Sequence, residues 1–293
     1  MIRLEKNGAI ADIATLGAEM RAYATKDGKQ RLWGGDTPAW GGVAPVLFPV
    51  VGALKDGRVR FGGKEYAPPR HGFARVTEFE VTARGDDFCS LEIHDTPETL
   101  EGYPFAFALR VTHRLLAGGF VTEYAVENRG DEVMPFTIGG HPGFACPMDE
   151  GEAFGDYEVR FEKPEEGKSL ICVPDGIIHG EEAVPLGEDG RTLALRYADF
   201  DARDTFIFAG LNSRSVELAH KNTGKGIRFS FPQSGTLAVW TRPEAQAPFV
   251  CLEPWIGLPA YADETGNFED KPYHIKLIPG QAFHTWYQVE IME

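Results

Sequence analysis

The chain has 293 residues, of which 43% are apolar and 12% aromatic, and its formal net charge at neutral pH is −15. This is the composition of a globular protein that can bury a large core without disulfides or a structural metal. The acidic balance argues against nucleic acid and anionic membranes as partners, because both are bound by clustered Lys and Arg.

The cysteines and the start of the chain predict a cytoplasmic location. The cysteines form no CxxC motif, and such sparse use fits a reducing compartment. The first 17 residues are interrupted by Arg3, Glu5 and Lys6, which is not the pattern of a signal peptide. No apolar run approaches the roughly 18 residues of a membrane span. The four cysteines are Cys89, Cys146, Cys172 and Cys251.

The first half of the chain predicts strands and one short helix. Residues 59–66, VRFGGKEY, read as a hairpin with a two-residue Gly turn. Residues 96–104 predict a short helix capped by Thr96. Residues 105–112 alternate apolar and other side chains, the period of a half-buried strand.

The second half continues the β pattern after a different stretch. Residues 150–189 are rich in Gly, Pro and acidic side chains, and we expect long surface loops there. Alternation returns at 227–231 and 285–291. Many short strands separated by turn residues predict an all-β sandwich or barrel. Because no linker or repeat is visible, residues 1–293 are predicted to form a single domain.

Two histidines stand in unusual surroundings, His71 in PPRHGFAR and His141 in GGHPGFACP. Pro142 restricts the backbone of the residue before it, which helps to aim the His141 ring. An imidazole with an ordinary pKa of about 6.5 suits proton transfer near neutrality. The alternative is that both are loop histidines, packed or hydrogen-bonded locally.

Glu253 ends the apolar run FVCLE, on the same predicted face as Phe249 and Cys251. Burial there would raise the pKa of the carboxyl toward that of a general base. The alternative is a buried structural ion pair. Two histidines and a glutamate can also bind a metal, but no HxH, HExxH or CxxC spacing supports this. We therefore predict no metal.

Two further residues could contact a ligand. Asp204, before the strand TFIF, could accept hydrogen bonds from sugar hydroxyls or serve only as a cap. Arg75 could bind an anionic group or be an ordinary surface arginine.

Four long segments together resemble the galactose mutarotase, or aldose 1-epimerase, superfamily, and within it the LacX-like bacterial branch. The resemblance implies a large antiparallel β-supersandwich (galactose mutarotase-like) with the site in a cleft on one face, and no cofactor. The segments are VAPVLFPVVGALKDGRVRFGGKEYAPPRHGFAR, FTIGGHPGFACP, DTFIFAGLNSRSVEL and FVCLEPWIGLPAYADETGNFEDKPYHIKLIPGQAF.

The resemblance also implies roles for individual residues. Glu253 matches the general base for the anomeric hydroxyl, and His141 matches the general acid for the ring oxygen. His71 matches a substrate-binding group near the anomeric carbon, and Asp204 a ligand of a sugar hydroxyl. Relatives often carry Arg where this chain has Ala53. Either Lys55 replaces the contact of that arginine with the substrate, or the pocket prefers another sugar.

The aromatic residues near these motifs are candidate walls for the sugar, although such side chains are as often part of a core. They are Phe73, Phe144 and Trp255.

The predicted function is that of an aldose 1-epimerase, or mutarotase, which interconverts the α and β anomers of a free aldose by opening and closing the ring. Two alternatives stay open: a hexose-6-phosphate mutarotase, which Arg75 would suit, and a non-catalytic sugar-binding or regulatory protein. A glycoside hydrolase is less well supported, because only Glu253 has a convincing setting and hydrolysis usually needs two carboxylates. The predicted partner is a small-molecule sugar, and a homodimer is left open.

Overall fold

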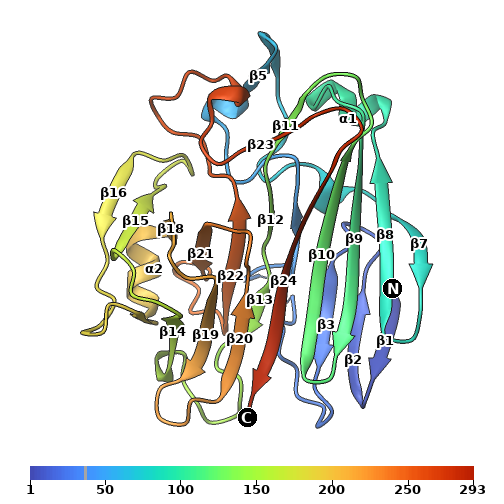
Figure 1. Ribbon diagram of the computed structural model, residues 1–293. Coiled ribbons are helices and arrows are strands. Elements are labelled where there is room, and N and C mark those ends of the chain that lie inside the picture. Colours follow the sequence, from blue (N-terminus) through green and yellow to red (C-terminus); the bar gives the residue numbers. More distant parts are fainter. Residues whose placement is uncertain (36–37) are drawn as a thin grey trace.

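The computed structural model describes residues 1–35 and 38–293. Two large antiparallel sheets form the two layers of the molecule, and smaller sheets lie at their margins (Figure 1). The nine-stranded sheet contains, in spatial order, β17 (Thr192–Ala194), β14 (Tyr157–Phe161), β19 (Ser215–His220), β20 (Gly226–Ser230), β24 (Ala282–Met292), β10 (Gly119–Asn128), β9 (Phe107–Leu116), β8 (Phe88–His94) and β7 (Glu80–Arg84).

The eight-stranded sheet carries Glu253, Trp255 and Phe144, and His141 lies between two of its strands. In spatial order it contains β16 (Gly180–Ala183), β15 (Lys168–Ile171), β18 (Thr205–Ala209), β21 (Thr236–Trp240), β22 (Phe249–Ile256), β12 (Ile138–Gly140) and β4 (Val46–Leu47), and β13 (Gly143–Ala145) also pairs with β22.

Three small sheets and two α-helices complete the fold of the described residues. The three-stranded sheet contains β1 (Ile2–Lys6), β2 (Ala9–Ile13) and β3 (Met20–Ala24). The two-stranded sheets pair β11 (Met134–Phe136) with β23 (Ile275–Leu277), and β5 (Val59–Phe61) with β6 (Lys64–Tyr66). The helices are α1 (Pro97–Gly102) and α2 (Tyr197–Arg203). Within the described ranges, neither helix has the length and apolar character needed to cross a membrane.

The predicted all-β class, hairpin and short helix are confirmed. Gly62 and Gly63 join β5 to β6 with φ values of 53° and 81°, which suit glycine. The Thr96 side chain caps α1 by accepting a hydrogen bond from the Thr99 amide. Alternation along β9 and β24 buries one face of each strand against the core. One cluster of buried side chains extends from Ile2 to Val289, but the single domain over 1–293 stays a prediction.

The expectation of long loops over 150–189 is wrong, because β14, β15 and β16 all lie in this stretch. Tyr157, Val159 and Phe161 alternate with polar residues along β14 and are buried. Their pattern is that of a strand, but it is short and surrounded by Gly, Pro and acidic residues. Helix α2 was not expected either, because it buries only Phe200 and shows no apolar period.

Candidate active site

Glu253 lies inside β22 rather than at its end, which corrects the predicted strand boundary. β22 continues through Pro254 to Ile256, and the Glu253 residue is only 2% exposed. Proline rarely occurs in a central strand because it lacks the backbone N–H. Here, the neighbour of β22 is split: β12 pairs with residues 255–256, and β13 with residues 249–251. The missing donor of Pro254 falls beside the gap between β12 and β13.

The gap between β12 and β13 holds His141, and this brings the imidazole to Glu253. The Nε2 atom of His141 is 3.2 Å from the Oε2 atom of Glu253. The backbone N–H of His141 donates to the carbonyl of Pro45, which fixes the segment on the other side. The His141 side chain is 13% exposed, so that it connects the buried carboxyl to solvent. Two residues far apart in sequence thus become neighbours through strand register.

The contact between His141 and Glu253 is close but not aligned as a hydrogen bond. Among the described residues, neither Nδ1 of His141 nor Oε2 of Glu253 has a hydrogen-bond partner of normal geometry, and both atoms are buried. A buried polar atom without a partner costs about 1–3 kcal/mol. Such atoms in a native fold need a reason, and binding of a polar ligand supplies one.

His71 is the third member of this group. Its ring centroid is 5.8 Å from that of His141, and its residue is 8% exposed. The Nδ1 atom of His71 accepts a hydrogen bond from the Gly52 amide at 3.2 Å, which leaves the proton of a neutral ring on Nε2. Gly72 allows this approach, because a Cβ there would be 1.9 Å from the Phe48 carbonyl oxygen.

Burial dominates the electrostatics of the three groups. Removal from water raises the pKa of Glu253 well above its usual value, although the positive charge of Arg70 opposes this. Burial also lowers the pKa of His141 to about 3, and the charges of Arg75 and Arg70 act in the same direction. Burial lowers the pKa of His71 well below its ordinary value. Burial thus disfavours the charged form of all three groups.

Aromatic rings enclose the His141 imidazole. The Trp40 indole lies over it, with ring centroids 4.9 Å apart and planes inclined by 34°. Trp240 meets it edge-on at 5.6 Å. Trp240 also donates a hydrogen bond from Nε1 to Oδ1 of Asp204 at 3.3 Å, and so connects Asp204 to the group.

The comparison with known proteins decides the family. The model of the aldose 1-epimerase family matches residues 1–289. The chain belongs to this aldose 1-epimerase family. The plasmid-encoded protein LacX of Lactococcus lactis subsp. lactis is 32% identical over an alignment of 298 positions that covers 99% of each chain.

Solved structures of aldose 1-epimerase relatives share the whole fold. A galactose mutarotase related enzyme from Lactobacillus acidophilus is 28% identical, with a TM-score of 0.92 over 100% of this chain and 97% of its own. A galactose mutarotase-like protein from Lactobacillus casei is 30% identical, with a TM-score of 0.92 over 100% of both chains. The predicted superfamily, the LacX-like branch and the mutarotase-like fold are confirmed.

Three of the predicted substrate-binding residues lie near the triad of His71, His141 and Glu253. Asp204 caps the C-terminal end of α2 with a φ of 65°, and its negative charge acts on Glu253. Trp255 is buried, with its ring centroid 6.2 Å from that of His71. Arg75 is exposed on a short 3₁₀ helix over Ala74–Val76, and its charge acts on both histidines.

The structure does not bring the other predicted contacts to the triad. Phe144 is fully buried in the core, where its ring packs edge-on against Phe229 at 5.7 Å, because alternation along β13 turns it inward. Phe73 also belongs to the core, beside Phe48 and Phe107. The Lys55 amine contacts the Glu264 carbonyl oxygen at 3.5 Å, and a sugar contact of Lys55 stays a prediction.

The sequence reasoning missed three residues, Arg70, Trp40 and Trp240. Arg70 directly precedes His71, and its guanidinium lies near Gly176, where a Cβ would be 3.2 Å from Nη1. Because Arg70 is adjacent to His71 in the sequence, it could have been predicted as a site residue. Trp40 and Trp240 carry no local signal, because only the fold brings them to His141.

A metal could use part of this group. His141, Cys251 and Glu253 each offer one ligand atom, and these atoms lie within 4.8 Å of one another. Nitrogen, sulfur and oxygen together suit a zinc-like ion. Burial, however, raises the pKa of the Cys251 thiol well above its ordinary value, which opposes the thiolate that a metal needs. The absence of a metal and of a cofactor stays a prediction.

Proposed function

We propose that this protein is an aldose 1-epimerase in activity as well as in family, and that it interconverts the α and β anomers of a free aldose. The observation that carries the proposal is the buried 3.2 Å approach of His141 Nε2 to Glu253 Oε2. Ring opening and closure require one group that removes a proton and one that delivers a proton. This pair offers one carboxyl and one imidazole, and two of its buried polar atoms lack a partner among the described residues.

The proposed reaction begins with Glu253 as a carboxylate and His141 as an imidazolium. Glu253 takes the proton from the anomeric hydroxyl while His141 protonates the ring oxygen, and the bond from C1 to the ring oxygen breaks. Rotation about C1–C2 of the open-chain aldehyde presents its other face. Closure reverses both proton transfers and yields the other anomer.

The uncharged form of the pair is compatible with these roles. It contains the same number of protons as the carboxylate–imidazolium form, so one transfer from Glu253 to His141 connects the two without exchange with solvent. Sugar hydroxyls that hydrogen-bond to the charged groups would stabilise that form. His71, with its proton on Nε2, is suited to donate to a sugar oxygen.

Anomer exchange is the direct test. Purified protein is mixed with freshly dissolved galactose or glucose, and the approach to anomeric equilibrium is followed by polarimetry or NMR. We expect acceleration by the wild type and its loss in Glu253→Gln. Glu152→Gln is the matched control, because Glu152 also lies beside a histidine, His220, outside the triad. A wild type that binds the sugar without accelerating exchange would instead indicate the non-catalytic sugar-binding protein.

The hexose 6-phosphate alternative is favoured by the arginines near the triad. Within the described chain, neither Arg70 nor Arg75 makes an ion pair, although the charges of both act on His71. Unpaired guanidinium groups suit a phosphate. The same assay with the 6-phosphates distinguishes the two substrates: a phosphorylated substrate should lose affinity in 0.5 M salt and in Arg70→Ala, whereas a neutral sugar should not.

The proposal also includes location and assembly. We place the reaction in the cytoplasm, where the four cysteines, all free and buried, would stay reduced. A homodimer stays an expectation that light scattering of the purified protein can check.

A further inference from the structure

Two glycines make room for the Trp40 indole beside His141. A Cβ on Gly42 would come within 2.6 Å of the indole, and a Cβ on Gly143 within 2.9 Å. Neither glycine has a positive φ, so both are needed for space rather than for backbone conformation. These two glycines form a cradle for one indole.

The backbone around Trp40 is fixed to the strand that follows His141. The Trp33 amide donates to the Gly143 carbonyl, and the Gly143 amide donates to the Val43 carbonyl. The Trp33 indole N–H also donates to the Trp40 carbonyl at 2.9 Å. Trp40 and His141 are therefore held in one hydrogen-bonded unit, and the indole position is tied to the imidazole position.

Two further rings pack against the Trp40 indole. Phe249 stacks with Trp40 at 5.4 Å, and Trp240 meets Trp40 edge-on at the same distance. We propose that Trp40 is a positioning residue that keeps water off the His141 ring and sets how readily this imidazole takes a proton. This inference extends the proposed function, since it assigns Trp40 a role in the same proton transfer.

Several charged or titratable groups also act on the pair, and the test must leave them unchanged. They are His71, Arg70, Arg75, Asp204, Cys251 and Glu253. Trp40 carries no charge, so replacing it changes hydration and packing without altering this set. Loss of an aromatic face would by itself lower the proton affinity of His141, because a cation is attracted to the ring. Entry of water would raise it.

The sign of the shift therefore tests the proposal. In ¹⁵N-histidine NMR spectra, Trp40→Ala should raise the pKa of His141 by about one unit or more, a tenfold change in proton affinity. Trp40→Phe should give a smaller rise. Gly42→Ala, which displaces the indole without removing it, should act in the same direction. His113 serves as the internal reference, since it is buried elsewhere and both its ring nitrogens are hydrogen-bonded.

Three results would overturn the proposal: an unchanged pKa of His141 in Trp40→Ala and Gly42→Ala, a lowered one, or an equal shift of His113, which would mean general loosening. Kinetics add a second readout. A positioning role predicts that kcat falls roughly 10–100-fold with little change in KM, whereas a sugar-contacting wall would raise KM instead. The NMR measurement does not need turnover. A protein without mutarotase activity would therefore refute the proposed function, while the pKa of His141 would still test the role of Trp40.

Discussion

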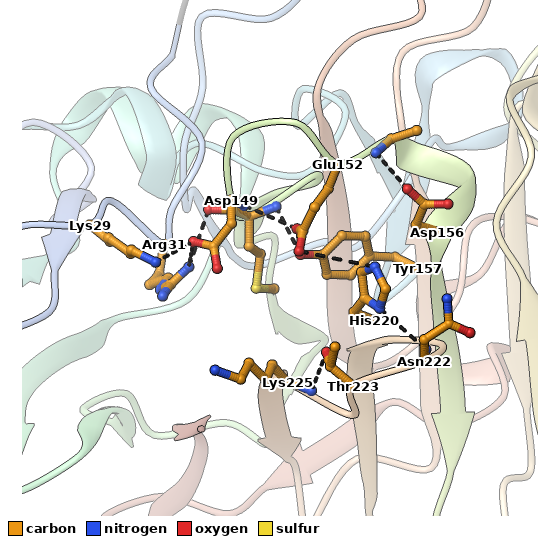
Figure 2. Close-up of polar contacts among 12 residues, drawn as sticks. Lys29, Arg31, Asp149, Glu152, Asp156, Tyr157, His220, Asn222, Thr223 and Lys225 are labelled. Atoms are coloured by element: carbon orange, nitrogen blue, oxygen red, sulfur yellow. Dashed lines mark hydrogen bonds and ion pairs between the residues drawn. The ribbon is translucent and has the colours of Figure 1, made fainter.

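Two histidine–glutamate pairs of the described chain, His141 with Glu253 and His220 with Glu152, differ in how their polar atoms are satisfied. Figure 2 shows the second pair, in which Nε2 of His220 and Oε1 of Glu152 are 4.0 Å apart. Oε2 of Glu152 accepts hydrogen bonds from the Tyr157 hydroxyl and from the Asp149 amide. Nδ1 of His220 accepts one from the Asn222 amide. Every partner in this cluster belongs to the protein itself.

The pair of His141 and Glu253 is the opposite case. Its atoms are closer and its glutamate is more deeply buried, yet Nδ1 of His141 and Oε2 of Glu253 lack partners in the described chain. The Glu152 and His220 side chains are 24% and 12% exposed, against 2% for Glu253 and 13% for His141. The same two residue types thus stabilise the fold in one place and are held at a cost in the other. The unsatisfied atoms, rather than the residue types, distinguish the pair of His141 and Glu253 from the pair of His220 and Glu152.

Activity should separate the pairs most strongly. Glu253→Gln or His141→Asn should lower kcat for anomer exchange by roughly 10²–10⁴-fold, because each removes a proton-transfer group. Glu152→Gln and His220→Asn should leave kcat within about twofold, since distant sites act independently. Polarimetry on matched preparations is the measurement. Near-normal turnover in Glu253→Gln would remove that carboxyl from the mechanism.

Stability should respond to pH through Glu253. The pKa of its carboxyl is raised on folding, so above the unfolded value of about 4.5 the folded state binds more protons than the unfolded state. Stability from this group is therefore lost as pH rises. Glu253→Gln removes the penalty and should raise the unfolding free energy at pH 8, with the gain shrinking toward pH 4.

Urea unfolding at both pH values measures this effect, and Glu152→Gln should show no such gain. His141 has the reverse dependence, because the unfolded ring takes a proton near pH 6.5 and the folded ring only near pH 3. Its contribution should make the wild type lose stability as pH falls through this window. A Glu253→Gln variant that is less stable than wild type at pH 8 would contradict the view that this carboxyl is held at a cost.

The smallest expected effect concerns Tyr157, whose hydroxyl bonds Glu152 and accepts from the Met148 amide. Tyr157→Phe removes these bonds and leaves their partners less satisfied, which should cost about 1–3 kcal/mol of unfolding free energy. Anomer exchange should not change. Denaturant midpoints and polarimetry on the same sample check both statements. A loss of activity without a loss of stability would mean that the cluster of Glu152, Tyr157 and His220 takes part in catalysis.

The sequence could predict the fold class, the hairpin around Gly62 and the helix after Thr96, because alternation and turn residues act locally. It also singled out His71, His141 and Glu253 from their Gly- and Pro-rich surroundings. It could not predict that Trp40 covers His141, since packing between distant segments decides this. Phe144 was misjudged because its neighbours in sequence carry the motif while its own side chain faces the core.

The split strand opposite Pro254 has a mechanical consequence. The spacing between paired strands is about 4.8 Å and is set by the backbone ladder. The His141 imidazole lies in a break between two paired strands, so the strands on both sides hold its backbone more rigidly than a mobile surface loop would. One residue inserted or deleted between Gly140 and Gly143 should therefore abolish turnover. The sandwich should still assemble, because the change would stay confined to the short segment between β12 and β13.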